Sequence, residues 1–295
     1  MSVRIGVINP PWIAPELMPS NALMLEDLGI EEMWLWEDCF FESGLGAAAG
    51  ALGRTNTLKV NVGLMPAPLR NVALTAMEVA TLDRMFPGRF QHVVGHGVQS
   101  WMGQTGARVE SPLQLLREYI VALDLLLSGA NTSVSGRYVN LDGVQLTYPP
   151  LTSLRTWGGA TGEKTLELLG EVASGVLVDG GTSPERLREI IDLIDRGCAT
   201  GGRSVRPEVP VYVYLFRGPE AARRYEEVFG PMPSNPEQAR GLLGSAEMIA
   251  ESIGRFVASG ATSVVLRPHE SDSDLPGFAS LVARDVLPAL RNSLS

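Results

Sequence analysis

Short apolar runs alternate with helix-patterned segments along the whole chain, and this alternation restricts the fold more than any other feature. Most of these runs lack polar alternation, which is typical of parallel strands that are covered on both faces. Eight strands close a barrel, so the sequence predicts an α/β fold, a (β/α)8 TIM barrel in one domain over residues 1–295. The predicted strands are Val3–Ile8, Met33–Trp36, Leu58–Leu64, Phe90–Gly95, Leu154–Gly159, Gly175–Val178, Val209–Leu215 and Thr262–Leu266.

The predicted helices have recognisable ends. Ser183 and Ser245 precede helical patterns as N-caps, and Ser111 begins the longest helix. We interpret Gly197 and Gly260 as the residues that end two of these helices.

Two connections are longer than a minimal barrel requires. The connection after the fourth strand contains the longest helix and a predicted hairpin over Thr132–Leu146. The connection after the seventh strand is rich in proline between Gly230 and Gly241, which is typical of a mobile excursion. We therefore expect insertions after strands four and seven.

Charge and cysteine content exclude several classes of protein. The chain has 24 Lys and Arg against 33 Asp and Glu, a net charge of −9 without a basic block, which argues against nucleic-acid binding. Two cysteines form neither a disulfide framework nor a four-thiolate zinc site, and three scattered histidines give no metal-binding motif. Without a long apolar stretch or a signal-peptide pattern, we expect a cytoplasmic protein that does not span a membrane.

Glycine-rich turns follow the fifth and sixth predicted strands, at the end where barrel enzymes place their active sites. A glycine turn at a helix N-terminus presents free N–H groups and the positive end of the helix dipole to an anion. These turns, Gly158–Gly162 and Gly180–Ser183, therefore predict a phosphate cradle. The alternative is that the glycines only make tight turns.

Acid–base candidates follow the second and fourth strands. Glu37 and Asp38 are adjacent, so one faces the barrel mouth, where it can orient a ring N–H or act as an acid or base. The alternative is a solvated turn or a salt bridge to an arginine. His96 lies between two glycines, which suggests that a flat group packs there, and a structural role is the alternative. His92 on the same strand is interpreted as structural.

A series of motifs resembles the luciferase-like flavin and deazaflavin oxidoreductases. The resemblance covers most of residues 1–215 and fades near 230–240. It implies a (β/α)8 barrel that holds FMN or the deazaflavin coenzyme F420 at the strand ends, and the motifs are closest to the deazaflavin branch. The motifs are Arg70-Asn71, Ala76–Arg84, Pro87–Phe90, Gly95–Gly97, Ser111-Pro112, Gly136–Tyr138, Pro149-Pro150 and Gly158–Gly162.

The resemblance also implies roles for individual residues. In the deazaflavin branch a bulged third strand carries a non-prolyl cis peptide behind the ring, which here matches Val62–Met65, around Gly63-Leu64. Several of those enzymes have Asp-His where this chain has Asp38-Cys39, so the catalytic acid is Asp38, His96 or Glu37, or water. The expected cofactor-binding residues are Asn9, Cys39, Gly63, Leu64, Met65, Gly95, Gly97, Ala160, Thr161, Gly162, Glu163, Gly180 and Gly181. The candidates to line the substrate pocket are Trp12, Phe40, Phe41 and Trp101, with packing in the core as the alternative.

The leading hypothesis is an oxidoreductase that transfers a hydride between F420 and a small organic substrate. One alternative is an FMN-dependent monooxygenase that receives FMNH₂ from a partner reductase. The sequence is also compatible with a flavin-binding protein without turnover and with a barrel enzyme of unrelated chemistry. No metal is expected. The resemblance further implies a homodimer formed through helices on one side of the barrel.

Overall fold

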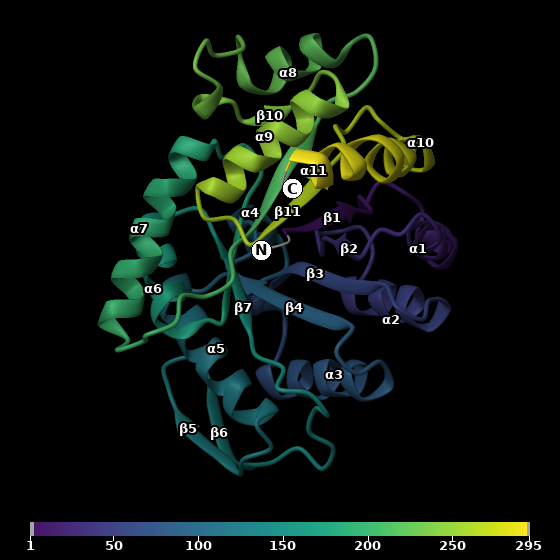
Figure 1. The fold of residues 1–295 in the computed structure, drawn as a ribbon. Helices are drawn as coiled ribbons and strands as arrows, with labels where there is room; N and C mark the ends of the chain where they lie inside the picture. Colours follow the sequence, from purple (N-terminus) through teal and green to yellow (C-terminus); the bar gives the residue numbers. More distant parts are fainter. Residues whose placement is uncertain (1–2, 294–295) are drawn as a thin grey trace.

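The computed structural model describes residues 3–293 and confirms the predicted barrel. Eight parallel strands pair in the order β9-β11-β1-β2-β3-β4-β7-β8, and the register of Val178 with Val211 joins β8 to β9 and closes the ring. Helices surround the strands (Figure 1). The strands are β1 (Arg4–Ile8), β2 (Glu32–Leu35), β3 (Lys59–Pro66), β4 (Phe90–Gly95), β7 (Trp157–Ala160), β8 (Gly175–Val178), β9 (Pro210–Leu215) and β11 (Ser263–Arg267).

The helices of the outer layer bury one apolar face against the strands. Ser183 and Ser245 are N-caps as predicted, because their side chains accept hydrogen bonds from the backbone N–H groups of Arg186 and Met248. The outer helices are α1 (Met18–Asp27), α2 (Gly44–Arg54), α3 (Val72–Met85), α5 (Pro112–Leu127), α6 (Glu163–Val172), α7 (Pro184–Thr200), α9 (Ala246–Ala258), α10 (Leu275–Leu281) and α11 (Leu287–Ser293). The helix after Ser111, α5, has 16 residues and α7 has 17, so the prediction that α5 is the longest is wrong.

The prediction that Gly197 ends a helix is wrong, because α7 continues to Thr200. A Cβ atom on Gly197 would lie 1.9 Å from the carbonyl oxygen of Glu167, and one on Gly170 would lie 2.2 Å from that of Ile194. The two glycines therefore allow α6 and α7 to pack with their backbones in contact. Gly260, by contrast, follows the end of α9 with a φ of 108° and fits the prediction.

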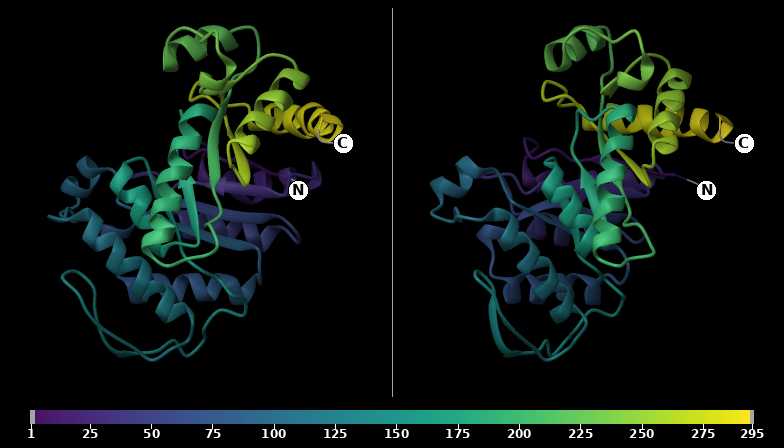
Figure 2. Two further views of the ribbon diagram at one scale, coloured as in Figure 1. Left: turned by 60° about the vertical axis from the view of Figure 1, so that its left-hand side comes forward. Right: turned by 90° about the vertical axis from the view of Figure 1, so that its left-hand side faces the viewer.

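Both long connections carry structure of their own. The predicted hairpin is present as β5 (Thr132–Ser135) and β6 (Asn140–Val144), and α4 (Gln99–Gln104) precedes it. In the connection after β9, α8 (Ala221–Phe229) precedes the proline-rich segment and β10 (Gly241–Leu242), which pairs with β9, follows it. The segment between them is irregular apart from the 3-10 turn Pro236–Gln238. The two insertions lie on opposite sides of the barrel in every view (Figure 2). Along residues 3–293, no helix is long and apolar enough to cross a membrane.

Side chains that fill the barrel form a cluster separate from the layer between strands and helices. Trp34 and Tyr212 meet edge to face at its centre, with ring centroids 5.5 Å apart. Because aromatic rings fill the middle of the barrel, the space left for a ligand lies above them, at the carboxyl ends of the strands.

Candidate active site

A cavity of about 570 Å³ opens at the carboxyl ends of the barrel strands, where the sequence predicts the site. Of the predicted site residues, Trp12, Glu37, Asp38, Phe41, Gly63, Leu64, His96, Gly97, Trp101, Ala160 and Thr161 line it. Its wall does not include the predicted residues Asn9, Cys39, Phe40, Met65, Gly95, Gly162, Glu163, Gly180 and Gly181. The wall further includes Pro11, Trp36, Pro66, Val98, Gly159, Leu177, Asp179, Tyr212, Arg267 and Glu270.

One wall of the cavity is built around Leu64. The pairing of β3 with β4 shifts register between Val62 and Met65, and the Gly63-Leu64 peptide bond is cis, as the resemblance implied. The Tyr212 hydroxyl donates a 2.7 Å hydrogen bond to the Gly63 carbonyl and fixes this bulge from inside the barrel.

Glycines on the neighbouring strands make room for the Leu64 side chain. A Cβ on Gly95 would lie 2.6 Å from Leu64 Cδ2, and one on Gly159 would lie 2.7 Å from the same atom. The result is a flat wall of backbone and one leucine, against which a planar ring can lie. Met65 next in the chain is fully buried in the layer between strands and helices and faces away from the cavity.

The adjacent carboxylates Glu37 and Asp38 have different surroundings. Glu37 accepts hydrogen bonds from Arg70 at 3.0 and 2.8 Å and from the Gly44 N–H at 2.9 Å, so it holds the start of α2. Of the two roles considered for Glu37, the structure therefore shows the salt bridge to an arginine. Asp38 lies beside Arg267 and Asp179, and burial raises its pKa, with Asp179 adding to the rise and Arg267 opposing it.

His96 projects from the loop after β4 onto the cavity wall. Its Nε2 lies 3.0 Å from the Thr165 hydroxyl, which α6 supplies. Burial lowers its pKa, which favours the neutral imidazole. His92 is fully buried, lies 3.1 Å from the Thr156 hydroxyl and does not line the cavity, in agreement with its structural interpretation.

Arg267, which follows the last barrel strand, is a site residue that was not predicted. Its guanidinium carbon lies 3.8 Å from the centroid of the Tyr214 ring and 4.6 Å from that of Trp36. Nη2 donates to Glu270 at 2.7 Å, whereas the buried Nε has no hydrogen-bond partner within residues 3–293. Its position directly after a barrel strand was the sequence feature that could have identified Arg267 as a site residue. Asp179 and Tyr212 also reach the wall without having been predicted.

The two halves of the predicted phosphate cradle differ. Around Gly162, which precedes α6, a Cβ would meet nothing within 4 Å, and the neighbouring Thr161 lines the cavity. A Cβ on Gly181 would lie 3.2 Å from the Phe229 ring of α8, so that turn is packed. The Gly180 N–H donates to the Asp179 carboxylate. The open half at Thr161 and Gly162 is therefore the one that can receive an anion.

The remaining predicted residues lie around the cavity rather than on it. The Asn9 amide oxygen accepts a hydrogen bond from Asn21 of α1. Phe40 is 66% exposed at the outer rim, whereas Phe41, the other phenylalanine predicted for the pocket, lines the cavity. The pKa of the Cys39 thiol is raised by burial and by the neighbouring carboxylates.

Three tryptophans of the described chain line the cavity. Trp12 and Trp36 meet on the wall with ring centroids 5.9 Å apart, and Trp101 lies on the same wall. Among the described residues, no group of three His, Cys, Asp or Glu side chains is placed to hold a metal ion.

Comparisons with known proteins identify the family of this chain. The model of the luciferase-like monooxygenase family matches residues 18–241. The 5,10-methylenetetrahydromethanopterin reductase of Methanolobus tindarius is 24% identical over 252 residues, which are 85% of this chain and 70% of that protein.

Two solved structures share the fold. An F420-dependent secondary alcohol dehydrogenase, solved with an F420-acetone adduct, superposes with a TM-score of 0.83 at 18% identity, over 99% of this chain and 100% of that one. The oxygenating constituent of 3,6-diketocamphane monooxygenase from a Pseudomonas putida plasmid, solved with FMN, has a TM-score of 0.79 at 16% identity and covers 98% of this chain and 99% of that one. With its family model matched over three quarters of its length, the chain belongs to the luciferase-like monooxygenase family.

Proposed function

We propose that this protein transfers a hydride between the deazaflavin coenzyme F420 and a small organic substrate. The observation that carries the proposal is the flat wall at Leu64, which faces a cavity of about 570 Å³ that also contains Asp38 and His96. The relation to a methylenetetrahydromethanopterin reductase and the fold shared with an F420-dependent alcohol dehydrogenase support it.

The residues of the cavity fit a planar ring with an anionic tail. The glycines at 95 and 159 leave the Leu64 wall free of other side chains, so a ring can make contact over its whole face. The open turn at Thr161 and Gly162 lies at the N-terminus of α6, where the helix dipole favours a phosphate. F420, when bound, supplies the hydride at a ring carbon.

The chain positions the substrate, excludes water and handles a proton. Burial raises the pKa of Asp38, and a carboxyl group with a raised pKa retains a proton to higher pH than an ordinary aspartate. We assign Asp38 as the group that holds this proton. His96 stays neutral and is oriented by Thr165, so it offers a hydrogen bond to the substrate or the ring. Glu37 supports the site through Arg70.

FMN is the second candidate cofactor, because the fold is shared with an FMN-bound monooxygenase component. In that case the protein is a monooxygenase that receives FMNH₂ from a reductase. Binding decides between the two: the purified chain is titrated with F420 and with FMN, followed by tryptophan fluorescence. We expect saturable binding of F420 with weaker binding of FMN.

A screen of enone, imine and pterin acceptors with reduced F420 then tests turnover by the return of the oxidised cofactor's absorbance. Gly254 provides a matched control, because a Cβ there would meet nothing within 4 Å and Gly254→Ala leaves the cavity unchanged. Binding of FMN alone would replace the first proposal by the second. Binding of neither cofactor would overturn both.

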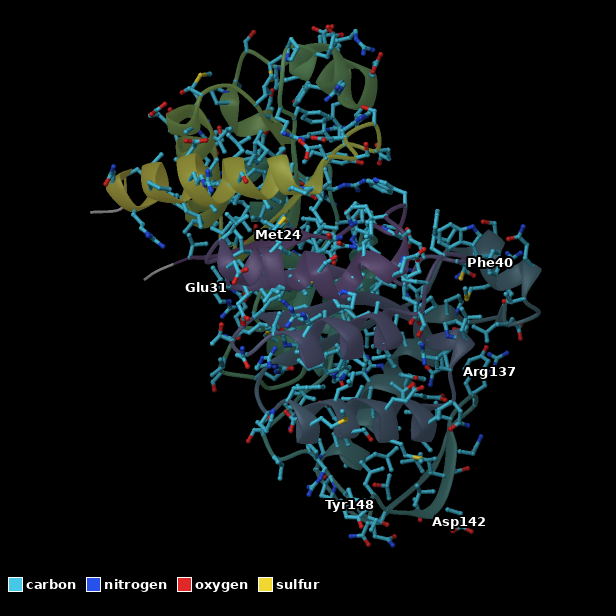
Figure 3. The ribbon with its side chains drawn as sticks, turned by 90° about the vertical axis from the view of Figure 1, so that its right-hand side faces the viewer. Met24, Glu31, Phe40, Arg137, Asp142 and Tyr148 are labelled. Carbon is cyan, nitrogen blue, oxygen red and sulfur yellow. The ribbon has the colours of Figure 1, made fainter. Side chains whose placement is uncertain are left out.

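We also propose that the chain forms a homodimer through α3. Leu74, Met77 and Met85 are 47%, 58% and 60% exposed and share one face of this helix. Figure 3 views the side of the molecule formed by α1, α2 and α3. Sedimentation should give a dimer for the wild type and a monomer for Met77→Glu, and a wild-type monomer would contradict this proposal.

A further inference from the structure

The charged side chains on the cavity wall do not balance. The carboxylates are Glu37, Asp38, Asp179 and Glu270, and Arg267 is the one Arg or Lys side chain among the described residues that line the cavity. Glu37 is paired with Arg70, which approaches it from outside the wall at 2.8 Å and also pairs with Glu78. The net charge inside the cavity is therefore set by three carboxylates and one guanidinium.

The charge of Arg267 is already matched. Its Nη2 donates to Glu270 at 2.7 Å, and aromatic rings cover it, with Tyr214 at 3.8 Å and Trp36 at 4.6 Å. Only 12% of its side chain is exposed. Glu270 and the two rings therefore reduce the positive charge that Arg267 can offer to an anionic ligand.

Asp179 forms no ion pair among the described residues, and Asp38 shares Arg267 with Glu270. Asp179 accepts a hydrogen bond from the Gly180 N–H, which is a neutral donor. Burial raises the pKa of Asp38, Arg267 opposes the rise, and the nearby Asp179 carboxylate adds to it. A negatively charged substrate group would add to this repulsion, whereas a positively charged one would relieve it.

The wall beside these carboxylates is aromatic. Trp12 and Trp36 lie with ring centroids 5.9 Å apart, and Trp101 and Phe41 add two more aromatic rings to the wall. Indole faces attract cations, and the attraction is stronger where water is excluded. Carboxylates and indole rings in one cavity favour the same kind of ligand.

We infer that the substrate carries a cationic nitrogen, such as a planar iminium, which is recognised by Asp179 and by the indole rings of the cavity wall. The inference rests on the proposed function, because an iminium is a hydride acceptor. Its C=N⁺ carbon gains a hydride with two electrons, the π pair moves to nitrogen, and the reduced cofactor is oxidised with release of one proton. Bulk water accepts that proton, because Asp38 is assigned above as the group that already holds one.

The test uses three probes that share one ring system and differ in charge. N-methylquinolinium is cationic, quinoline is neutral at about pH 8, and quinoline-2-carboxylate is anionic there. Their dissociation constants are measured by equilibrium dialysis against the full chain without cofactor. We expect the cation to bind about tenfold more tightly than quinoline, and the anion to bind most weakly.

Two variants locate the source of the preference. Asp179→Asn keeps an oxygen for the Gly180 N–H but removes the charge, so the preference for the cation should fall several-fold while quinoline binding is unchanged. Glu185→Gln is the matched control, because Glu185 is exposed on α7, lies off the cavity wall and carries the same charge. It should leave all three dissociation constants unchanged.

The outcomes separate this inference from the proposed function. If quinoline binds as tightly as the cation, or if Asp179→Asn and Glu185→Gln behave alike, the inference is overturned. F420 binding to the same preparation is measured separately. If the protein binds F420 but shows no preference for the cation, the inference is overturned and the proposed function stands. If the protein prefers the cation but does not bind F420, the proposed function is overturned.

Discussion

The two ends of the barrel use polar residues in different ways. At the amino ends of the strands, Glu32 lies 2.9 Å from Arg4 Nε and accepts hydrogen bonds from the Trp34 indole and the Ser263 hydroxyl. At the carboxyl ends, the Arg267 Nε and Trp12 Nε1 atoms are buried and have no hydrogen-bond partner within the described chain. The buried Arg4 Nε at the amino ends also makes no hydrogen bond, but it lies within ion-pair distance of Glu32. In Figure 3, Glu31 and Phe40, before and after β2, mark these two ends.

This difference indicates that residues at the amino ends of the strands contribute mainly to stability and residues at the carboxyl ends mainly to function. Polar groups that bond to one another at the amino ends stabilise the folded state, because removal of one leaves its partners buried and unpaired. Groups without partners at the carboxyl ends are available to a ligand. Substitutions at the two ends should therefore have opposite effects on stability and on activity.

The largest effect is expected for Asp38→Asn at the carboxyl end. Turnover with reduced F420 should fall by about 10²–10⁴-fold, because the group that holds the proton is lost. Burial raises the pKa of Asp38, so its ionisation disfavours the folded state and the variant should be as stable as the wild type or more stable near neutral pH. Single-turnover kinetics and urea unfolding measure the two quantities.

The pH profile gives the sign of the Asp38 effect. If Asp38 must be protonated, turnover in the wild type decreases as pH rises through its raised pKa, and Asp38→Asn removes this decrease. Unchanged turnover in Asp38→Asn, with the pH profile of the wild type, would show that the carboxyl end does not act through this residue.

Glu32→Ala at the amino end should show the reverse profile. Glu32 is 5% exposed, and its removal leaves Arg4 and the Trp34 indole with fewer partners, so unfolding free energy should fall by about 3–5 kcal/mol. Affinity for F420, measured on the folded protein at low temperature, should be unchanged. A loss of affinity without a loss of stability would abolish the contrast between the two ends.

Gly159→Ala tests the flat wall with a single methyl group. A Cβ at Gly159 would lie 2.7 Å from Leu64 Cδ2, so the leucine must move into the cavity. We expect F420 affinity to fall by about tenfold, or about 1.4 kcal/mol, with a smaller loss of stability because a flexible side chain can adjust. Gly254→Ala, which meets nothing within 4 Å, should bind F420 like the wild type.

The smallest effect is expected from His92, which belongs to neither end. Burial lowers its pKa from 6.5 to about 3, so the unfolded chain takes up a proton there before the folded one does. Stability is therefore full above pH 6.5 and decreases as pH falls, by about 1 kcal/mol between pH 6.5 and 5.5. His92→Gln should have a flatter dependence in urea titrations, and an equal slope would contradict the burial of a neutral imidazole.

The fold was predictable from the sequence because buried parallel strands are continuous apolar runs. Phe90–Gly95 and Gly175–Val178 agree residue by residue with β4 and β8. The prediction for Gly197 was wrong, since a glycine required for contact between two helices looks the same in the sequence as a glycine that ends one. The sequence has no local signal for β10 at the end of the proline-rich segment, because its pairing with β9 depends on a distant strand.

The candidate site was predictable in position but only partly in its residues. The ends of the predicted strands indicated that the site lies at the mouth of the barrel. The resemblance of the motifs to the deazaflavin branch predicted the bulge at Gly63 and Leu64. The directions of Glu37 and Asp38 depend on Arg70, which is 33 residues away in sequence from Glu37. The filled turn at Gly181 depends on the ring of Phe229. Contacts of this kind follow from tertiary packing and have no local signal.

A crystal structure of the complex with oxidised F420 tests the central claim most directly. The ring should lie in the cavity against Leu64 and the backbone of Gly159, with its phosphate at Thr161 and Gly162. A ring bound elsewhere on the molecule, or a phosphate placed away from this turn, would contradict the assignment of the carboxyl ends of the strands as the site of hydride transfer.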